Sequence, residues 1–328
     1  MMRTVLALVV CALTGAIGAD VFSQTSESTD PIQLLVGRLD IDGYKGGIKA
    51  LTQFRDRRDG TEENRTAMEW IERQLQSYRC ISDRIRYTYQ SATREQVFCT
   101  KSGTTASDEM YMLAAHMDGI GGGEAADDNA SGTALVMELA RILNMPDVQT
   151  DYSIRFMFWN GGENGSEGMR AYVQQRLDLQ GKEDYPGSGN YPEPRWLGAI
   201  EHDTLLWDRG AQRKGDINIE YVTPSKFGAQ SMNMAFAFRD ANAKYAEYPA
   251  EVGTYAPGAD ASPLIDFMPF LSLRANTHSQ IAAGWNPHRH MSTDVYSTYV
   301  EDDFLLGFNA AKTTLSAIGK LAGVKLKR

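Results

Sequence analysis

The sequence predicts an α/β fold in which a mostly parallel, mixed sheet is covered by helices on both faces. Short apolar segments alternate with amphipathic segments over residues 110–203, and this alternation is typical of parallel strands linked by crossover helices. The chain has 328 residues, of which 42% are hydrophobic, so it can bury a substantial core. Acidic residues and histidines follow directly after several of the apolar segments, where open α/β sheets bind their ligands.

The first residues have the order of a secretory signal peptide. Arg3 precedes an apolar run over residues 5–13, which is followed by small residues up to Ala19. The run is shorter than the roughly 20 apolar residues that a membrane-spanning helix needs. We therefore predict a secreted or periplasmic protein. Its expected parts are a signal peptide over 1–19, a mobile lead-in over 20–31 and a single domain over 32–328.

The next part of the chain predicts a helix followed by an antiparallel pair of strands. Apolar residues recur at helical spacing over 61–78, and strand-like segments lie at 84–89 and 96–100. Cys80 and Cys99 are the cysteines left after signal removal. In an oxidising compartment they favour a disulfide, with two unpaired buried thiols as the alternative.

Strands and helices are then expected to alternate to the end of the chain. The expected strands are 110–115, 153–159, 197–203, 217–222 and 270–274, and the expected helices are 131–143, 167–176, 232–248 and 299–321. Residues 181–196 are rich in Gly, Pro and Tyr, and predict an inserted surface loop long enough to serve a function.

The charge of the chain excludes one class of partner. The net charge is -9 and the isoelectric point is near 5.2, whereas binding to nucleic acid needs basic side chains that neutralise phosphates. We expect a peptide or small amide as substrate, and no membrane contact after signal removal.

Candidate metal ligands and catalytic acids follow the predicted strands in five short segments. These are His116–Asp118, a glycine-rich loop ending in Asp127 and Asp128, Gly162–Glu163, Glu201–Asp203, and a loop with His288 and His290. Helix capping explains any single aspartate of this kind. It does not explain two adjacent acids behind a glycine-rich loop just downstream of His116. Imidazole and carboxylate ligands suit zinc.

The order of these motifs resembles that of the co-catalytic zinc exopeptidases of metallopeptidase family twenty-eight, the group of bacterial leucyl aminopeptidases. The resemblance rests on the segments HMD, AADDNASG, GGENGSEGM, IEHD and NPHRHMSTD within residues 116–294. It implies a zinc-exopeptidase-like fold, two zinc ions per chain and hydrolysis of peptide bonds by a metal-activated water, most simply as an aminopeptidase. In this scheme Asp128 bridges the ions, His116 and Asp203 hold one, and Glu163 and His290 hold the other.

The resemblance also assigns supporting roles. Asp118 would orient His116 through the second ring nitrogen of the imidazole. Tyr255, which precedes Gly258 and Asp260, is similar to a family tyrosine that contacts the reacting carbonyl. The other histidines are expected to be structural or surface residues; they are His202, His278 and His288.

Gly162 departs from the family pattern, because members usually carry their general-base glutamate at this position. A positioned general base contributes about 10²–10⁴-fold in rate, so the glycine predicts weak hydrolysis unless another carboxylate substitutes. Glu201 is the first candidate, since the two-residue period of a strand places it on the same face as Asp203. Glu124 is the second. On this interpretation, a glutamate introduced at position 162 should raise the activity.

Three alternatives stay open at the level of the sequence. The register of the third motif could differ by one residue, with Glu163 as the base and Asn164 as the ligand. The chain could instead be a catalytically silent protein that binds zinc and peptides. It could also be a non-peptide amide hydrolase or a glutaminyl cyclase of the same fold.

Overall fold

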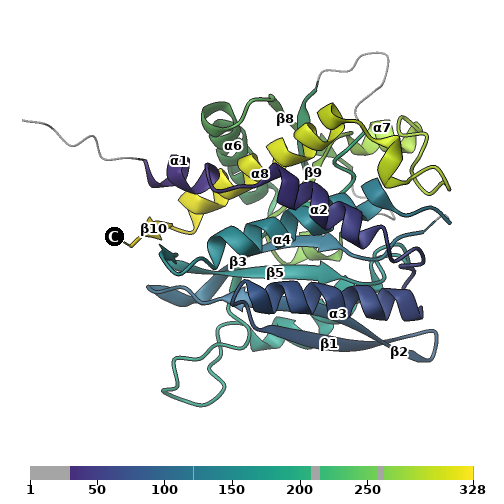
Figure 1. The fold of residues 1–328 in the computed structure, drawn as a ribbon. Coiled ribbons are helices and arrows are strands. Elements are labelled where there is room, and N and C mark those ends of the chain that lie inside the picture. Colours follow the sequence, from purple (N-terminus) through teal and green to yellow (C-terminus); the bar gives the residue numbers. More distant parts are fainter. Residues whose placement is uncertain (1–29, 121, 208–214, 257–261, 328) are drawn as a thin grey trace, which may run out of the picture.

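A computed structural model describes residues 30–120, 122–207, 215–256 and 262–327 (Figure 1). The predicted signal peptide, most of the lead-in, Gly258 and Asp260 lie outside these residues. Among the described helices, none combines the length and apolar character needed to cross a membrane.

An eight-stranded mixed sheet forms the centre of the molecule, in the order β1-β2-β5-β3-β6-β9-β7-β8. The four pairs β3–β5, β3–β6, β6–β9 and β7–β8 are parallel, and β1–β2, β2–β5 and β7–β9 are antiparallel. The strands are β1 (Ser82–Tyr89), β2 (Ala92–Lys101), β3 (Ala106–His116), β5 (Tyr152–Trp159), β6 (Arg195–His202), β7 (Ile217–Val222), β8 (Ala250–Tyr255) and β9 (Phe270–Arg274). Two short strands, β4 (Val148–Gln149) and β10 (Lys325–Leu326), pair separately.

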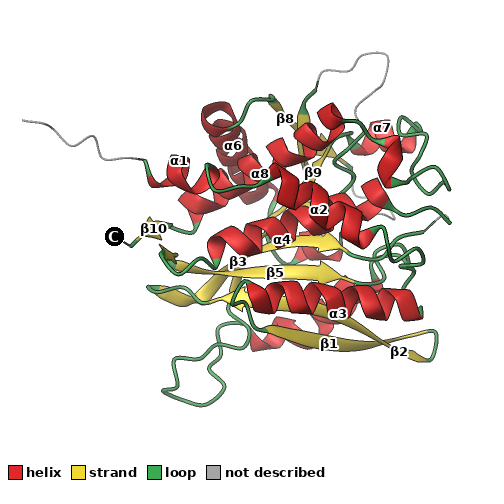
Figure 2. Ribbon diagram, viewed as in Figure 1, coloured by secondary structure: helices red, strands yellow, loops and turns green. Residues whose placement is uncertain are grey.

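Helices cover both faces of this sheet, as Figure 2 shows for the near face with α2, α3 and α4. The helices are α1 (Pro31–Val36), α2 (Ile41–Leu51), α3 (Glu62–Ser77), α4 (Gly132–Leu143), α5 (Glu167–Arg176), α6 (Gly228–Tyr245), α7 (His278–Ala282) and α8 (Glu301–Leu321). Strand β3 shows how the two faces are buried. Met112 and Ala114 pack into one apolar cluster together with α5, while Leu113 and Ala115 pack into the other together with α4 and α8. Neighbouring residues of a strand point to opposite faces, so β3 is buried on both sides.

The amino-terminal part agrees with the sequence-based prediction. Thr61 caps α3 by accepting a hydrogen bond from the backbone N–H of Asn64 at 3.1 Å. Cys80 and Cys99 form a disulfide with a Cα–Cα distance of 5.8 Å. The predicted disulfide is therefore confirmed, and it ties the end of α3 to β2.

Helix α2 and strand β8 were not predicted, and the structure explains why. Helix α2 has the sequence IDGYKGGIKAL, whose three glycines lower its intrinsic helix propensity. Packing compensates, because a Cβ built at Gly47 would lie 3.2 Å from Ala134 Cβ of α4. The sixth helix ends at Tyr245 rather than at residue 248, since β8 begins at Ala250.

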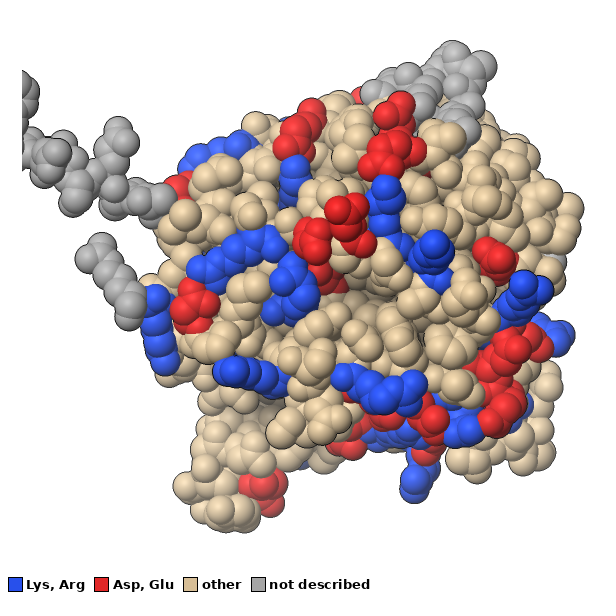
Figure 3. Space-filling model, viewed as in Figure 1, with Lys and Arg blue, Asp and Glu red and all other residues tan. Residues whose placement is uncertain are grey.

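On the side seen in Figure 3, acidic and basic side chains are interspersed rather than gathered into one basic stripe. Many charged side chains of the described residues form ion pairs with each other. Arg84, for example, contacts Glu72 and Glu95, each at 2.6 Å.

The predicted insertion ends two residues earlier than expected, because Arg195 and Trp196 belong to β6. It links the end of the α5 region to the start of β6, so it lies at the amino-terminal edge of the parallel strands (Figure 1). The end of this insertion is anchored by Glu193, which is fully buried and lies 2.5 Å from the guanidinium of Arg155. The indole N–H of Trp196 also donates to Glu193, at 2.5 Å.

We expect Glu193→Gln to destabilise the fold, because it leaves the buried guanidinium of Arg155 without a counter-charge. Breaking a buried ion pair in this way costs about 3–5 kcal/mol, which urea unfolding followed by circular dichroism will measure. Glu247→Gln is a matched control. It removes a carboxylate from an exposed ion pair with Lys312, and such pairs contribute about 0–1 kcal/mol. Equal losses in the two variants would contradict the structural role of Glu193.

Candidate metal centre

The structure brings all five predicted ligands together at one edge of the sheet. His116 ends β3, Glu163 follows β5 and Asp203 follows β6. These strands are parallel, so their carboxyl ends meet at the same edge. Asp128 lies in a helical turn before α4, and His290 in the loop before α8.

Asp128 is the centre of this cluster, because each of its two carboxylate oxygens faces a different pair of side chains. Oδ1 lies 3.3 Å from His116 Nε2, which is itself 3.4 Å from Asp203 Oδ1. Oδ2 lies 3.2 Å from His290 Nε2, which is 3.0 Å from Glu163 Oε2. A carboxylate shared in this way can serve two metal positions.

The polar atoms of the cluster fit a cation. In the described part of the chain, several buried polar atoms of the ligand residues have no hydrogen-bond partner. They are both carboxylate oxygens of Asp128, Glu163 Oε1, Asp203 Oδ1 and His290 Nε2. Buried polar atoms are normally satisfied, and divalent metals satisfy such atoms by coordination. His116, Asp128 and Glu163 each offer a ligand atom within 4.8 Å of the others. Imidazole nitrogen with carboxylate oxygen is a set that suits zinc.

The electrostatics point the same way. Burial and, next, the charge of Asp128 raise the pKa of Glu163 to about 7. The adjacent carboxylates of Asp128 and Glu163 raise the pKa of His290 to about 9. Burial disfavours the charged form of Asp128, but the adjacent rings of His116 and His290 hold its pKa well below the usual value. The carboxylates thus draw positive charge into the cluster, which metal ions also supply.

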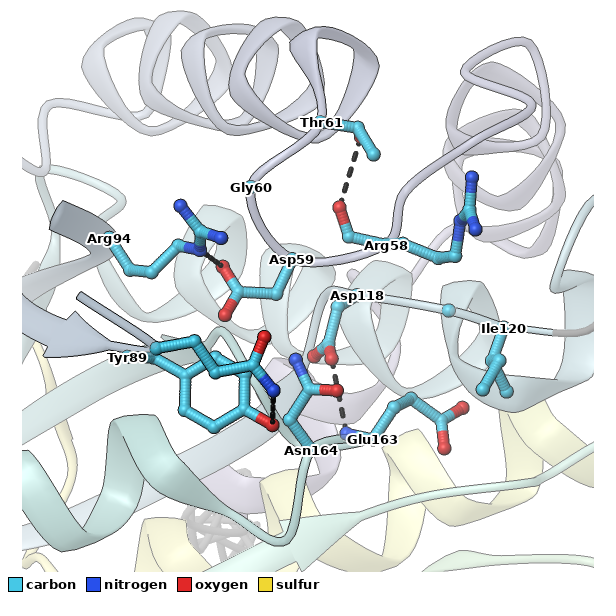
Figure 4. A pocket seen from close by; sticks show the side chains of 12 residues that line it. Arg58, Asp59, Gly60, Thr61, Tyr89, Arg94, Asp118, Ile120, Glu163 and Asn164 are labelled. Atoms are coloured by element: carbon cyan, nitrogen blue, oxygen red, sulfur yellow. Dashed lines mark hydrogen bonds and ion pairs between the residues drawn. The ribbon is translucent and has the colours of Figure 1, made fainter. Parts of the chain in front are cut away.

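Asp118 contacts His116 and also holds a neighbouring turn. His116 Nδ1 lies 3.1 Å from the backbone oxygen of Asp118 and 3.5 Å from its carboxylate, so the main chain holds the ring more closely. The carboxylate instead accepts hydrogen bonds from the backbone N–H groups of Gly162 at 3.0 Å and Glu163 at 3.1 Å (Figure 4). Asp118 therefore fixes the turn that carries Glu163.

Gly162 packs directly against His116, and this corrects one expectation. A Cβ built at Gly162 would lie 2.6 Å from His116 Cβ and 2.7 Å from its Cγ. No glutamate fits here unless His116 moves, so introducing one at position 162 would disturb a ligand rather than supply a base.

The alternative register, with Asn164 as the ligand, has no support in the geometry. Glu163 contacts His290 at 3.0 Å, whereas the side chain of Asn164 forms no hydrogen bond with another of the described ligand residues. Asn164 lines a smaller cavity of about 340 Å³, whose wall also contains Asp59, Arg94 and Glu163 (Figure 4).

A larger cavity of about 830 Å³ opens onto the cluster and contains Glu201, one of the two candidate bases. Burial, followed by the charge of Asp203, raises the pKa of Glu201 to about 7. The other candidate, Glu124, is engaged elsewhere, since its carboxylate accepts the backbone N–H of Tyr296 at 2.9 Å. Glu124 is therefore a structural residue.

Tyr255 and His278 lie in the wall of the same cavity. Their rings stack with centroids 3.5 Å apart and an interplanar angle of 12°. Glu220 lies 2.6 Å from His278 Nδ1 and also accepts the backbone N–H of His278. His278, expected to be a structural or surface residue, thus lies in the wall of the cavity beside the metal ligands.

The remaining histidines are structural, as expected. The ring nitrogens of His202 lie 3.1 Å from the oxygen of Ala114 and 2.9 Å from Thr314 Oγ1. His288 packs edge-on against Trp207.

Sequence reasoning missed two arginines beside the ligands. Arg274 Nη2 lies 2.7 Å from Asp203 Oδ2, and Arg289 Nε lies 3.0 Å from Asp128 Oδ2. Arg274 is the last residue of β9 and Arg289 adjoins His290. In the sequence, only acids and histidines were considered at the carboxyl ends of strands. Including basic residues at these positions would have identified Arg274.

Comparisons with known proteins agree with this geometry. Residues 97–184 match the sequence profile of peptidase family M28. The chain is 38% identical over 87 residues to a probable lipoprotein aminopeptidase, LpqL, of Mycobacterium tuberculosis. That match covers 26% of this chain and only 16% of the relative, well under two thirds of its length.

Solved structures share the fold over most of the chain. LapB from Legionella pneumophila has a TM-score of 0.70 at 18% identity, covering 90% of this chain and 75% of LapB. A glutaminyl cyclase from Porphyromonas gingivalis has a TM-score of 0.65 at 16% identity, covering 86% of this chain and 99% of the cyclase. These likenesses confirm the predicted fold class.

The geometry predicts that zinc content depends most on Asp128. Two zinc ions per chain are expected, with His116→Ala or His290→Ala losing one or both. Asp128→Ala should lose more than either, because Asp128 lies beside both pairs of ligands. Metal analysis after dialysis measures this, and His288→Ala serves as the control that keeps its zinc. Equal losses from all three ligand variants would rule out a shared role for Asp128.

The contact between Gly162 and His116 predicts that Gly162→Glu lowers zinc content and does not raise activity. Gly46→Ala is the matched control, since nothing lies within 4 Å of a Cβ built at Gly46. Zinc analysis and circular dichroism on both variants separate local damage from unfolding. Full zinc content together with a large gain in hydrolysis would overturn the packing argument.

Proposed function

We propose that this chain belongs to peptidase family M28 and is an exported, zinc-dependent exopeptidase, most simply an aminopeptidase. The observation that carries the proposal is the position of Asp128. Its two oxygens face separate pairs of ligands, the polar atoms around it are buried without partners, and a cavity of about 830 Å³ opens beside them.

The ligand residues divide between two metal positions. His116 and Asp203 would hold one ion, Glu163 and His290 the other, and Asp128 both. Zinc would act as a Lewis acid that polarises the scissile carbonyl and makes the bound water a better nucleophile. Asp118 keeps Glu163 in place through the backbone of the turn.

Glu201 is the residue that we propose as proton acceptor in place of the missing glutamate. Glu163 and Asp203, which also line the cavity, are taken up as ligands, and Glu220 accepts two hydrogen bonds from His278. Glu201 accepts no hydrogen bond from the residues that the structure describes, and it lies two residues before Asp203 on β6. It can therefore take a proton from the attacking water and return it to the leaving amine.

The test compares Glu201→Gln with the native protein on a panel of aminoacyl chromogenic substrates. The amide keeps the shape of the side chain but cannot accept the proton, so hydrolysis should fall by about 10²–10⁴-fold while zinc content stays unchanged. The native activity should disappear with a chelator and return with zinc. Unchanged activity in Glu201→Gln would exclude Glu201 as the base.

The same panel separates the rival functions. A native protein that keeps zinc but cleaves none of the substrates would be a silent binding protein, a possibility that Gly162 favours. Conversion of glutaminyl peptides to cyclised products without hydrolysis would indicate a glutaminyl cyclase.

Export is part of the proposal. The charged, apolar and small-residue regions of residues 1–19 support it, as does the similarity to a probable lipoprotein aminopeptidase. Amino-terminal sequencing of the protein recovered outside the cytoplasm should begin near residue 20.

A further inference from the structure

The cavity beside the metal centre has a polar, cation-bearing wall. Arg274 and Arg289 both line it, together with Thr254 and apolar residues such as Phe270 and Ile281. A pocket built only for an apolar side chain such as leucine needs no guanidinium group, because burying one against hydrocarbon leaves its donors unsatisfied. The lining therefore suggests that a polar part of the substrate is recognised.

Arg274 is held rigidly but is not saturated. Its side chain is 15% exposed, Nη2 pairs with Asp203 and Nε donates to Ser272 Oγ at 2.9 Å. A guanidinium has five N–H donors in a planar fork, and these two bonds engage only part of it. Because Arg274 also lines the cavity, its remaining donors are available to a ligand there.

If the ligand carboxylates bind metal ions, few carboxylates in the cavity wall remain to pair with the guanidinium groups of Arg274 and Arg289. Asp203 and Asp128, which contact Arg274 and Arg289, are metal ligands in the proposed site. Glu220 is engaged by the backbone and ring of His278. Among the described residues that line the cavity, Glu201 is then the one acid that is neither a proposed ligand nor bonded to His278.

We propose that Arg274, assisted by Arg289, binds a carboxylate of the substrate next to the bond that is cleaved. A guanidinium fork matches a carboxylate in shape and charge. The carboxylate has two possible sources, an acidic side chain on the amino-terminal residue or the carboxyl terminus of the peptide. This inference rests on the proposed peptidase function and names its substrate class.

The first experiment compares substrates that differ in one charge. Glutamyl and glutaminyl p-nitroanilides have nearly the same shape, and leucylalanine can be offered with a free or an amidated carboxyl terminus. Hydrogen bonds to charged groups justify an expected preference of about tenfold or more in kcat/KM for the charged member of one pair. A preference within the first pair identifies an acidic side chain as the group that is recognised. A preference within the second pair identifies the carboxyl terminus of the peptide. No preference in either pair, with leucyl p-nitroanilide cleaved as well, overturns the inference while the proposed function stands.

The second experiment asks whether Arg274 is the cause. The ratio of kcat/KM for the charged and the neutral substrate is the readout, because both substrates use the same metal and any loss of zinc cancels. Arg274→Gln should bring the ratio to about one, and Arg274→Lys should keep part of it, since it retains the charge without the fork. Arg239→Gln is the control, as Arg239 lies on α6 in an exposed ion pair with Asp240. If Arg274 only positions Asp203, both rates will fall together and the ratio will not move, which contradicts the proposal.

A binding measurement separates failure of this inference from failure of the proposed function. Isothermal titration of the zinc-containing protein with L-glutamate, L-glutamine, N-acetylalanine and N-acetylalanine amide needs no turnover. Tighter binding of the charged member of a pair, lost in Arg274→Gln, supports the carboxylate site even if no peptide is cleaved. Equal binding within both pairs overturns it.

Discussion

The candidate site depends on the position of one carboxylate, that of Asp128. His116 and Asp203 approach it from β3 and β6, and Glu163 and His290 from the loops after β5 and before α8. Its two oxygens lie beside one histidine of each pair, so a shift of this side chain would separate the two groups. The surrounding fold is therefore best understood by how it fixes Asp128.

Two buried residues to which the sequence analysis assigned no role do much of this fixing. Asp294 accepts hydrogen bonds from the backbone N–H groups of Asp127 at 2.8 Å and Asp128 at 3.1 Å. Arg57 donates to backbone oxygens of Met117 and three other residues, two of which, Glu124 and Ala125, precede Asp128. Burial lowers the pKa of Arg57 to about 10, so the guanidinium stays charged at neutral pH. Its strong donors hold a glycine-rich loop that has little intrinsic order.

The sequence was most informative where a local pattern determines the structure. Apolar periodicity located most strands and helices, and the polar residues after β3, β5 and β6 identified the cluster. It was less informative where tertiary packing decides. The glycine-rich α2 is stabilised by contact with α4, and His278 reaches the cavity because Glu220 and Tyr255 hold it there. The role of Gly162 was also misread, since the clash with His116 exists only in three dimensions.

Arg274 connects the unusual features of this site. Glu201 lies near the end of β6 and Asp203 directly follows that strand, so burial and then the charge of Asp203 disfavour ionisation of Glu201. Two neighbouring carboxylates in a buried wall are costly unless a cation compensates. Arg274 provides that charge, because it pairs with Asp203 and also favours the ionised form of Glu201. The guanidinium that favours the ionised form of Glu201 therefore also lies in the wall of the cavity that would receive the substrate in the proposed function.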